Sequence, residues 1–318
     1  MRIKGAAVCV FCLLMMSGKA GAYTEVERQE VMQQTLDEVE ISVDVRAGYL
    51  RGETAYDFNH QTSELTFPLD NWVMGTGVRV SWAPFSFNGV FYAPVEHDAG
   101  DMKDRDWNAG GLISETYSDA AVDAIILDGN LRYDFYRRTL ADSYDDFALR
   151  ADDEVRVGAL LGYRYERYDY DMYEVYYQRD LIFGRTGQTL YSDTLVLTYK
   201  VEYFLPYLGL AGDVKRDNWG VGAEVKYSFY PTAYDVDNHL LRGLTFYGDY
   251  EGTGNVWMGS IHGFWDFCRA WRVKGGVDLM VARISGTTYE EQRDPAWNAD
   301  QAVDMRHWLV WGAIEYTF

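Results

Sequence analysis

Hydrophobic and polar residues alternate with a period of two along most of this chain. In residues 220–230, valine, alanine, tyrosine and phenylalanine fall on one face, and glycine, glutamate, lysine and serine fall on the other. Successive side chains of a β-strand point to opposite faces, so this pattern predicts a strand with one apolar face. The same pattern recurs at residues 41–49, 72–82, 125–135, 157–165, 195–203, 257–267, 273–281 and 308–318. The chain is therefore predicted to be all-β.

Two architectures produce such alternation, a soluble sandwich and a closed membrane barrel. Here the polar faces carry charges of both signs on nearly every strand, and the apolar faces are rich in tryptophan and tyrosine near the strand ends. Aromatic residues at both edges of an apolar band are typical of barrels that face lipid. The chain also ends in an aromatic residue, Phe318, which agrees with the usual assembly signal of such barrels. The pattern therefore favours a membrane barrel.

The predicted connections are short at one end of the strands and long at the other. Short turns are expected near 82–86, 215–218 and 267–271, with a longer one at 136–153, and long loops near 53–62, 95–120, 171–192, 231–254 and 284–306. Outer-membrane barrels have short periplasmic turns, long extracellular loops and an even number of strands. The prediction is a closed antiparallel transmembrane barrel of about ten strands, with long extracellular loops.

The first 22 residues have the features of a secretory signal peptide. Arg2 and Lys4 precede an apolar run over 6–16, and small residues follow it. That run is too short to span a membrane as a helix. Residues 23–318 are then expected to form the barrel, with Cys268 as the remaining cysteine, which excludes an intramolecular disulfide.

The charge of the chain is strongly negative, at −20. The leader holds three basic residues and no acid, so the mature chain stands at −20 − 3 = −23. Such a charge argues against a nucleic-acid partner and suits the electrostatic steering of basic partners. Solubility alone would explain it equally well.

Two short runs of charged residues are candidates for chemistry. Asp235, Asp237 and His239 follow the strand predicted at 220–230, and if the strand continues they share one side of it. An aspartate beside a histidine can orient the imidazole and stabilise its protonated form, as a general base requires. Asp104 and Asp106 repeat the spacing of two residues. The barrel is expected to bring these two loops together.

Other chemistries find less support. The sequence has no HExxH motif, Walker loop or Rossmann fingerprint. The loop of Asp104 and Asp106 lacks the ligand count of an EF-hand, and His97 with Asp98 is interpreted as a solvated pair, so no metal site is expected. His262 is expected to face the lumen in a structural role.

Several motifs resemble the omptin family of outer-membrane aspartate/histidine endopeptidases. They lie in order along nearly the whole mature chain, at compatible spacing. The matching stretches are Asp101 to Trp107, which contains Asp104-Arg105-Asp106-Trp107; Tyr199-Lys200 with Leu205 to Leu210; Val225-Lys226-Tyr227 leading into Asp237-Asn238-His239; and the closing Tyr316-Thr317-Phe318. The resemblance implies a ten-stranded barrel with its active site in extracellular loops.

The resemblance also implies roles for individual residues. Asp237 and His239 would deprotonate a water, which Asp104 and Asp106 would hold from the opposite wall, bearing on the scissile carbonyl. Asp235 would be the acid of the primary specificity pocket, with Glu115 on the leaving-group side.

The chain departs from the family pattern at three places, one of which is the second loop, where the usual His-Pro run after Glu115 is missing. Tyr56 stands where the family has a second pocket glutamate, with Asp57 and Glu53 close in sequence. Asp57 is therefore the candidate for substrate binding on the first loop. Arg167 is the candidate for a lipid phosphate on the outer face, but Glu202 stands where a basic partner is expected. The resemblance implies a need for bound lipopolysaccharide, and this departure leaves the lipid dependence open.

The expected function is that of a surface endopeptidase. It would sit in the outer membrane with its active site outside, and hydrolyse exogenous, cationic polypeptides near basic residues through a water activated by the Asp–His pair. No cofactor is expected apart from lipopolysaccharide, and the protein is expected to be a monomer in contact with outer-membrane glycolipid. The alternatives are an inert omptin-like barrel that acts as an adhesin or binding protein, and a lipid hydrolase, for which a convincing Ser/His pair is missing.

Overall fold

The computed structural model describes residues 39–58, 62–139, 153–291 and 299–318, and the predicted signal peptide lies outside them. The strands are β1 (Glu40–Phe58), β2 (Ser63–Trp82), β3 (Phe85–Pro94), β4 (Asp98–Asn108), β5 (Gly111–Thr139), β6 (Glu154–Asp180), β7 (Gln188–Arg216), β8 (Trp219–Ser228), β9 (Thr232–His239), β10 (Leu244–Glu251), β11 (Gly254–Asp266), β12 (Trp271–Glu290) and β13 (Ala299–Thr317). No helix in this part of the chain is long and apolar enough to cross a membrane.

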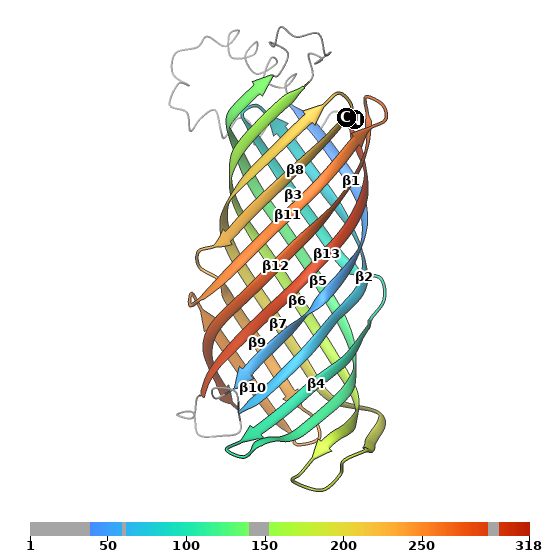
Figure 1. The fold of residues 1–318 in the computed structure, drawn as a ribbon, viewed down its shortest axis with the longest axis vertical. Coiled ribbons are helices and arrows are strands. Elements are labelled where there is room, and N and C mark those ends of the chain that lie inside the picture. Colours follow the sequence, from blue (N-terminus) through green and yellow to red (C-terminus); the bar gives the residue numbers. More distant parts are fainter. Residues whose placement is uncertain (1–38, 59–61, 140–152, 292–298) are drawn as a thin grey trace.

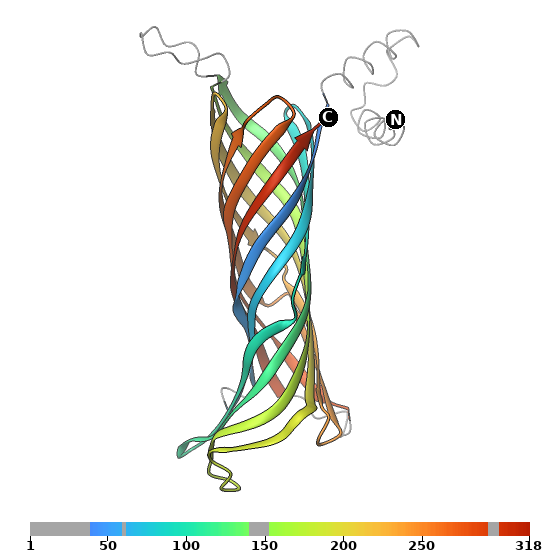
Figure 2. The same ribbon diagram turned by 90° about the vertical axis from the view of Figure 1, so that its right-hand side faces the viewer.

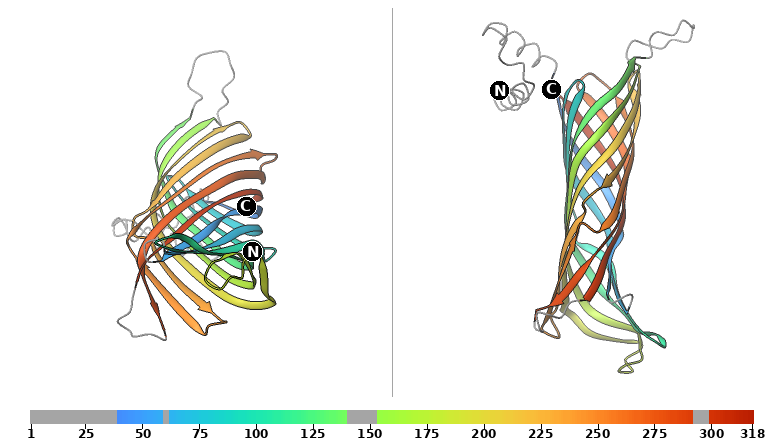
Figure 3. Two further views of the ribbon diagram at one scale, coloured as in Figure 1. Left: turned by 60° about the horizontal axis from the view of Figure 1, so that its bottom comes forward. Right: turned by 90° about the vertical axis from the view of Figure 1, so that its left-hand side faces the viewer.

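The strands close into one antiparallel ring, because β13 pairs with β1 (Figures 1 and 3). Three positions of the ring are each shared by two strands. β3 and β4 lie between β2 and β5, β8 and β9 both pair with β7, and β10 and β11 both pair with β12. Thirteen strands therefore make 13 − 3 = 10 positions. The predicted barrel of about ten strands is confirmed.

The two ends of the barrel differ. The short turns at 83–84, 217–218 and 267–270 lie at the end that holds the C-terminus, which we call the proximal end (Figure 1). At the opposite, distal end the strands continue as long paired hairpins (Figure 2). Short connections thus lie on one side, as predicted. Of the longer turn predicted at 136–153, residues 140–152 lie outside the described part of the chain.

The long connections predicted at the distal end are present, but most of their length is paired strand. β4 covers residues 98–108, β6 continues to Asp180, and β9 and β10 cover most of 231–254. Asp104, Asp106, Asp237 and His239 therefore lie on strands. The alternation continues beyond the apolar band, but its apolar residues turn inward. On β6, Tyr168, Tyr170 and Met172 are buried, so the change of face resembles the end of a strand.

Apolar side chains on the outer wall form a continuous band. Val45, Trp72 and Ile261 lie on it and are each more than half exposed. Apolar side chains on the outside of a closed barrel indicate contact with lipid, since water would not favour such a surface. On β6 the band ends at Tyr165, and the next outward residues are charged. The hairpins of the distal end lie beyond it.

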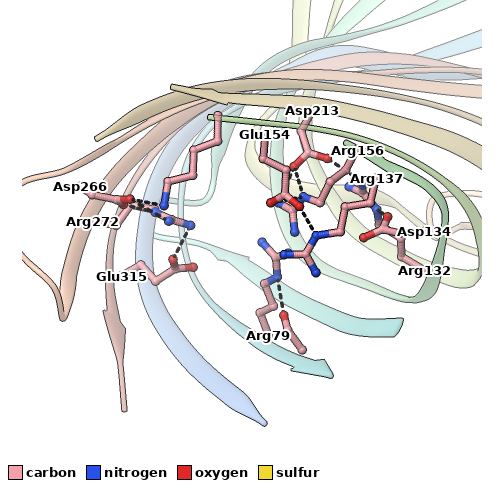
Figure 4. Close-up of polar contacts among 12 residues, drawn as sticks. Arg79, Arg132, Asp134, Arg137, Glu154, Arg156, Asp213, Asp266, Arg272 and Glu315 are labelled. Carbon is pink, nitrogen blue, oxygen red and sulfur yellow. Dashed lines mark hydrogen bonds and ion pairs between the residues drawn. The ribbon is translucent and has the colours of Figure 1, made fainter. Parts of the chain in front are cut away.

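The proximal half of the lumen is filled by ion pairs. Arg132 of β5 and Arg156 of β6 both reach Asp213 of β7, at 2.5 Å, and Figure 4 shows them pointing toward it. Such pairs join β5 and β6 to β7 and satisfy charges that the narrow lumen shields from water. His262 lines the same cavity, which confirms that it faces the lumen.

The distal half of the lumen is filled instead by apolar and aromatic side chains. Tyr199 and Tyr203 of β7 are buried there, and the ring of Tyr199 stacks on Phe67 of β2 with centroids 4.1 Å apart. The apolar face of residues 195–203 therefore points inward, whereas the corresponding face of residues 220–230 points outward. This packed layer forms the floor of a cleft at the distal end.

Candidate active site

A cleft of about 220 Å³ opens above the aromatic layer. It is lined by Tyr56, Ser63, Leu65, Asp104, Asp106, Asp235, Asp237, His239, Arg242, Phe246, Thr288 and Gln301. β4 and β9 lie on opposite walls of the ring, because β5, β6 and β7 separate them on one side. The structure thus brings the two charged runs of the sequence to one cleft that has room for several waters.

Asp237 and His239 lie two residues apart on β9 and point to the same side. Their contact joins Nε2 of His239 to Oδ2 of Asp237 at 2.9 Å. The ring of Phe246 packs edge-on against the imidazole, with centroids 5.4 Å apart. Arg242, in the turn after β9, donates a hydrogen bond to Nδ1. This arrangement selects the neutral tautomer with its proton on Nε2, since the guanidinium can act as a donor but not as an acceptor.

Tyr56 of β1 holds the other side of the aspartate. Its buried hydroxyl donates to Oδ2 of Asp237, the oxygen that His239 also contacts. The ring packs on Phe67 and Tyr199, with centroids 6.0 and 5.4 Å away. Burial, and next the charge of Asp237, raise the pKa of Tyr56 well above its ordinary value. The phenol therefore stays protonated and remains a donor.

Asp104 and Asp106 occupy the facing wall on β4. Oδ1 of Asp104 and Oδ1 of Asp237 are buried without a protein hydrogen-bond partner in the part of the chain that the structure describes. Burial, and next the negative charge of Asp106, raise the pKa of Asp104 to about 7, against the opposing charge of Arg242. Two carboxylate oxygens that lack a donor face a space large enough for water, which is the arrangement expected where a polar ligand binds.

Asp235 lies at the floor of the cleft. Its Oδ2 accepts hydrogen bonds from the hydroxyls of Tyr250, at 2.8 Å, and Tyr199, at 3.1 Å. Burial, and to a smaller extent the charge of Asp237, raise its pKa to about 7 against the opposing hydrogen bonds from the two tyrosines. Near neutral pH the floor therefore carries a partial negative charge.

The structure does not bring every predicted site residue to this cleft. Glu115 lies on β5 and bonds Arg105, at 3.2 Å, and Tyr117, at 3.0 Å. Asp57 lies on β1 and pairs with Arg283 at 3.3 Å. Neither lines the cleft. Both carboxylates are held by neighbouring side chains, and a role for either in substrate binding stays a prediction.

Arg167 lies on the outer wall, as predicted, but its guanidinium is engaged. It bonds Asp169 at 2.6 and 3.0 Å and lies opposite Glu202 in the register of β6 and β7. Glu202 in turn pairs with Lys200 at 2.7 Å. The basic groups here are thus each matched by an acid.

Three residues of the site were not identified from the sequence as functional. Tyr56 was seen as a departure from the family, but its bond to Asp237 spans 181 positions and has no local signal. Arg242 lies three residues after His239, which is a weak hint. Phe246 belongs to the next strand, and its packing follows from the pairing of β9 with β10.

The barrel and its acidic cleft place the chain in a class of outer-membrane β-barrel proteins with a distal Asp/His site. The model of the omptin family matches residues 37–269, and the chain belongs to this family. The resemblance seen in the sequence is confirmed, and with it the location in the outer membrane.

Individual relatives agree with this assignment. Outer membrane protease OmpP of Escherichia coli (strain K12) is 26% identical over 222 residues, which cover 65% of this chain and 66% of that protein. A plasminogen activator of Yersinia pestis is 24% identical over 255 residues, which cover 77% and 75%. The crystal structure of outer membrane protease OmpT from Escherichia coli shares the fold, with a TM-score of 0.68 and 17% identity over 88% of this chain and 97% of that one.

Proposed function

We propose that this protein is an endopeptidase whose distal end faces the outside of the cell. It hydrolyses polypeptides with a water molecule that Asp237 and His239 activate. One observation carries the proposal. The imidazole, held by its aspartate, faces the buried, unpaired oxygen of Asp104 across a cleft that has room for water. Membership of the omptin family, whose relatives above include named proteases, supports the same activity.

The proposed reaction assigns one task to each side chain. The lone pair on Nδ1 of His239 takes a proton from water as the water oxygen attacks the carbonyl carbon of the peptide. Asp237 stabilises the imidazolium through Nε2. The protonated carboxyl of Asp104 donates to the developing oxyanion, and Asp106 helps to hold the water. The imidazolium then returns the proton to the peptide nitrogen as the C–N bond breaks.

This reaction requires Arg242 to move. In the structure its guanidinium covers Nδ1, the nitrogen that must accept the proton. Arg242 is exposed and lies in a turn, so its side chain is free to swing away when substrate enters. The contact is also the observation that favours the alternative, an inert barrel that binds polypeptides without cleaving them.

The charges of the cleft suit a basic substrate. Four aspartates line it, against one arginine. Asp235 at the floor would pair with a lysine or arginine side chain next to the scissile bond. Because Tyr56 adds no second carboxylate and Asp235 is partly protonated near neutral pH, the proposed preference for basic residues is graded rather than strict. Arg167 is paired with Asp169, so the proposed dependence on lipopolysaccharide is weak.

Cleavage of defined peptides by the refolded protein tests this function. Peptides with paired Lys/Arg and matched peptides with paired Gln would be incubated with the wild type, Asp237→Ala, His239→Ala and a control, His97→Ala. His97 is exposed and pairs with Asp123, away from the cleft. We expect cleavage of the basic peptides by the wild type and the control, and loss in the two site variants. Cleavage that survives both site changes would refute the assignment, and binding without cleavage by the wild type would establish the inert barrel.

A further inference from the structure

The hairpin between β6 and β7 ends in three consecutive large apolar residues that face water. Leu181, Ile182 and Phe183 are 61%, 54% and 69% exposed. This hairpin, yellow-green in the ribbon, reaches farther from the barrel than its neighbours (Figures 1 and 2). Soluble surfaces rarely group exposed apolar side chains in this way unless something binds them. We call residues 181–183 the apolar tip.

The apolar tip is held in place by a buried side chain. Asp180 is 3% exposed and accepts backbone N–H bonds from Ile182, at 2.9 Å, Phe183, at 2.9 Å, and Arg185, at 3.4 Å. The backbone N–H of Leu181 donates to the neighbouring hairpin, at the carbonyl of Ile113, at 3.0 Å. The turn is thus a defined structure that fixes the three side chains in an outward position.

Basic and aromatic groups surround the apolar tip. The guanidinium of Arg185 lies over the ring of Phe183, 4.9 Å from its centroid, and bonds the hydroxyl of Tyr177 at 3.2 Å. Arg179 is exposed on the same hairpin. From 175 to 192 the chain has two arginines and one acid, Asp180, whereas the whole chain carries −20. Glu174 and Asp193 lie directly outside this range. The positive charge offered to an anionic surface is therefore confined to the end of the hairpin around the apolar tip.

The apolar tip cannot reach the bilayer that the barrel spans. The outward apolar face of β6 ends at Tyr165, and Arg167, Asp169 and Asp171 follow on that face. The tip begins about fifteen residues beyond Tyr165, and a tilted strand of that length rises roughly 30 Å or more. Contact with the barrel's own lipid is therefore excluded by distance.

We propose that the apolar tip inserts into the interface of a second bilayer, one whose surface is anionic. A narrow projecting turn suits lipid, because acyl chains can surround three outward side chains, whereas a folded protein would need a matching pocket. Arginine and tyrosine next to apolar groups are the side chains that stabilise such insertion, since their polar ends reach the headgroups. Basic groups near the surface strengthen binding to anionic lipid. In this way the proposed contact would hold the distal cleft close to another membrane.

Binding to vesicles tests this inference without any use of peptidase activity. The full mature protein in nanodiscs would be mixed with phosphatidylcholine vesicles that contain 0 or about 30% phosphatidylglycerol, and bound protein would be counted after flotation. The variants are Leu181→Asn/Ile182→Asn/Phe183→Asn, Arg179→Gln/Arg185→Gln, and a control, Leu240→Asn/Leu241→Asn. The control removes two leucines, 46% and 48% exposed, from the turn between β9 and β10.

We expect the wild type and the control to bind the anionic vesicles. The triple variant should bind at least about tenfold more weakly, since each large apolar side chain contributes about that factor when it leaves water. The double arginine variant should lose the preference for anionic over neutral vesicles. Ile182→Asp serves as a second, single change at the tip, and resistance of each barrel to unheated SDS confirms folding. Failure of the wild type to bind, unchanged binding by the triple variant, or an equal loss in the control would overturn the proposal.

Discussion

The guanidinium of Arg242 donates a hydrogen bond to Nδ1 of His239, and this bond occupies the nitrogen through which the histidine would act as a base. An arginine cannot accept a proton at any pH at which the protein is folded. A water in the cleft therefore cannot be deprotonated by His239 until the arginine leaves.

The first prediction follows from this contact. Arg242→Gln should raise kcat/KM for a basic peptide by roughly three- to tenfold, because the lost hydrogen bond to a charged donor is of the order of 1 kcal/mol. Steady-state assays on the refolded variant measure this effect. Arg283→Gln is the matched control, since Arg283 pairs with Asp57 and Asp304 outside the cleft. A fall in kcat/KM would mean that Arg242 assists the reaction.

The second prediction concerns Tyr56, which shares Oδ2 of Asp237 with His239. Tyr56→Phe keeps the packed ring and removes the donor. Asp237 should then be less well held, so kcat should fall about tenfold. Its charge should also bear more fully on the imidazole, because the phenol no longer shares Oδ2.

Nitrogen-15 NMR of the histidines provides a second readout for Tyr56. The ring-nitrogen chemical shifts of His239, assigned with His239→Ala, should differ between Tyr56→Phe and the wild type whether or not the protein cleaves peptides. Tyr203→Phe is the control, because it removes an equally buried hydroxyl whose partner is Thr54, at 2.6 Å. The same ring-nitrogen shifts of His239 in the wild type and in Tyr56→Phe would exclude a role of Tyr56 in placing the dyad.

These two contacts show where sequence reasoning stops. The alternation on 220–230 predicted the barrel wall, and the spacing of two residues placed Asp235, Asp237 and His239 on one side, as β9 has them. The predicted continuation of the strand is wrong, because β9 is a separate strand from β8. Both inferences use neighbours along one strand. The contact between Tyr56 and Asp237 depends instead on which residues of two strands come together inside the closed ring. No periodic pattern in the sequence specifies that contact.

Period-two patterns also leave the direction of a face undetermined. Residues 195–203 and 220–230 alternate alike, yet Tyr199 and Tyr203 point into the lumen while Val221 and Val225 point outward. An apolar layer above the lumenal ion pairs and an apolar band toward lipid have the same composition. The distal strands resemble loops in the sequence because their apolar residues change face, as Tyr168, Tyr170 and Met172 of β6 do when they turn inward.

The third prediction uses the pKa of Asp104, which burial and next Asp106 raise to about 7. Below this pH the carboxyl keeps its proton and can donate to the oxyanion; above it the donor is lost. The value of kcat should therefore fall as the pH rises through about 7. In Asp104→Asn the amide donates at every pH. The variant should therefore have a lower kcat than the wild type, but this kcat should not fall as the pH rises through about 7. Glu115→Gln, a change outside the cleft, should keep the fall of kcat with rising pH. If that fall persists in Asp104→Asn, Asp104 is excluded as the donor.

The last prediction concerns the stability of the barrel and rests on Asp235. Burial is the main cause that raises the pKa of this carboxyl from 3.8 to about 7. A raised pKa means that the folded protein holds a proton that the unfolded chain releases. The contribution to stability is therefore complete below about pH 3.8 and is lost as the pH rises through about 7.

Asp235→Asn separates this contribution from the rest. The amide oxygen can still accept from Tyr199 and Tyr250, but no proton is lost, so the free energy of unfolding should fall less steeply between pH 4 and 7 than in the wild type. Urea unfolding in detergent micelles at several pH values measures this slope. Asp57→Asn, a change in a carboxylate outside the cleft, should not flatten it. If Asp235→Asn and the wild type share one slope, Asp235 is already ionised in the folded barrel, and the floor of the cleft carries a full charge for a basic side chain at neutral pH.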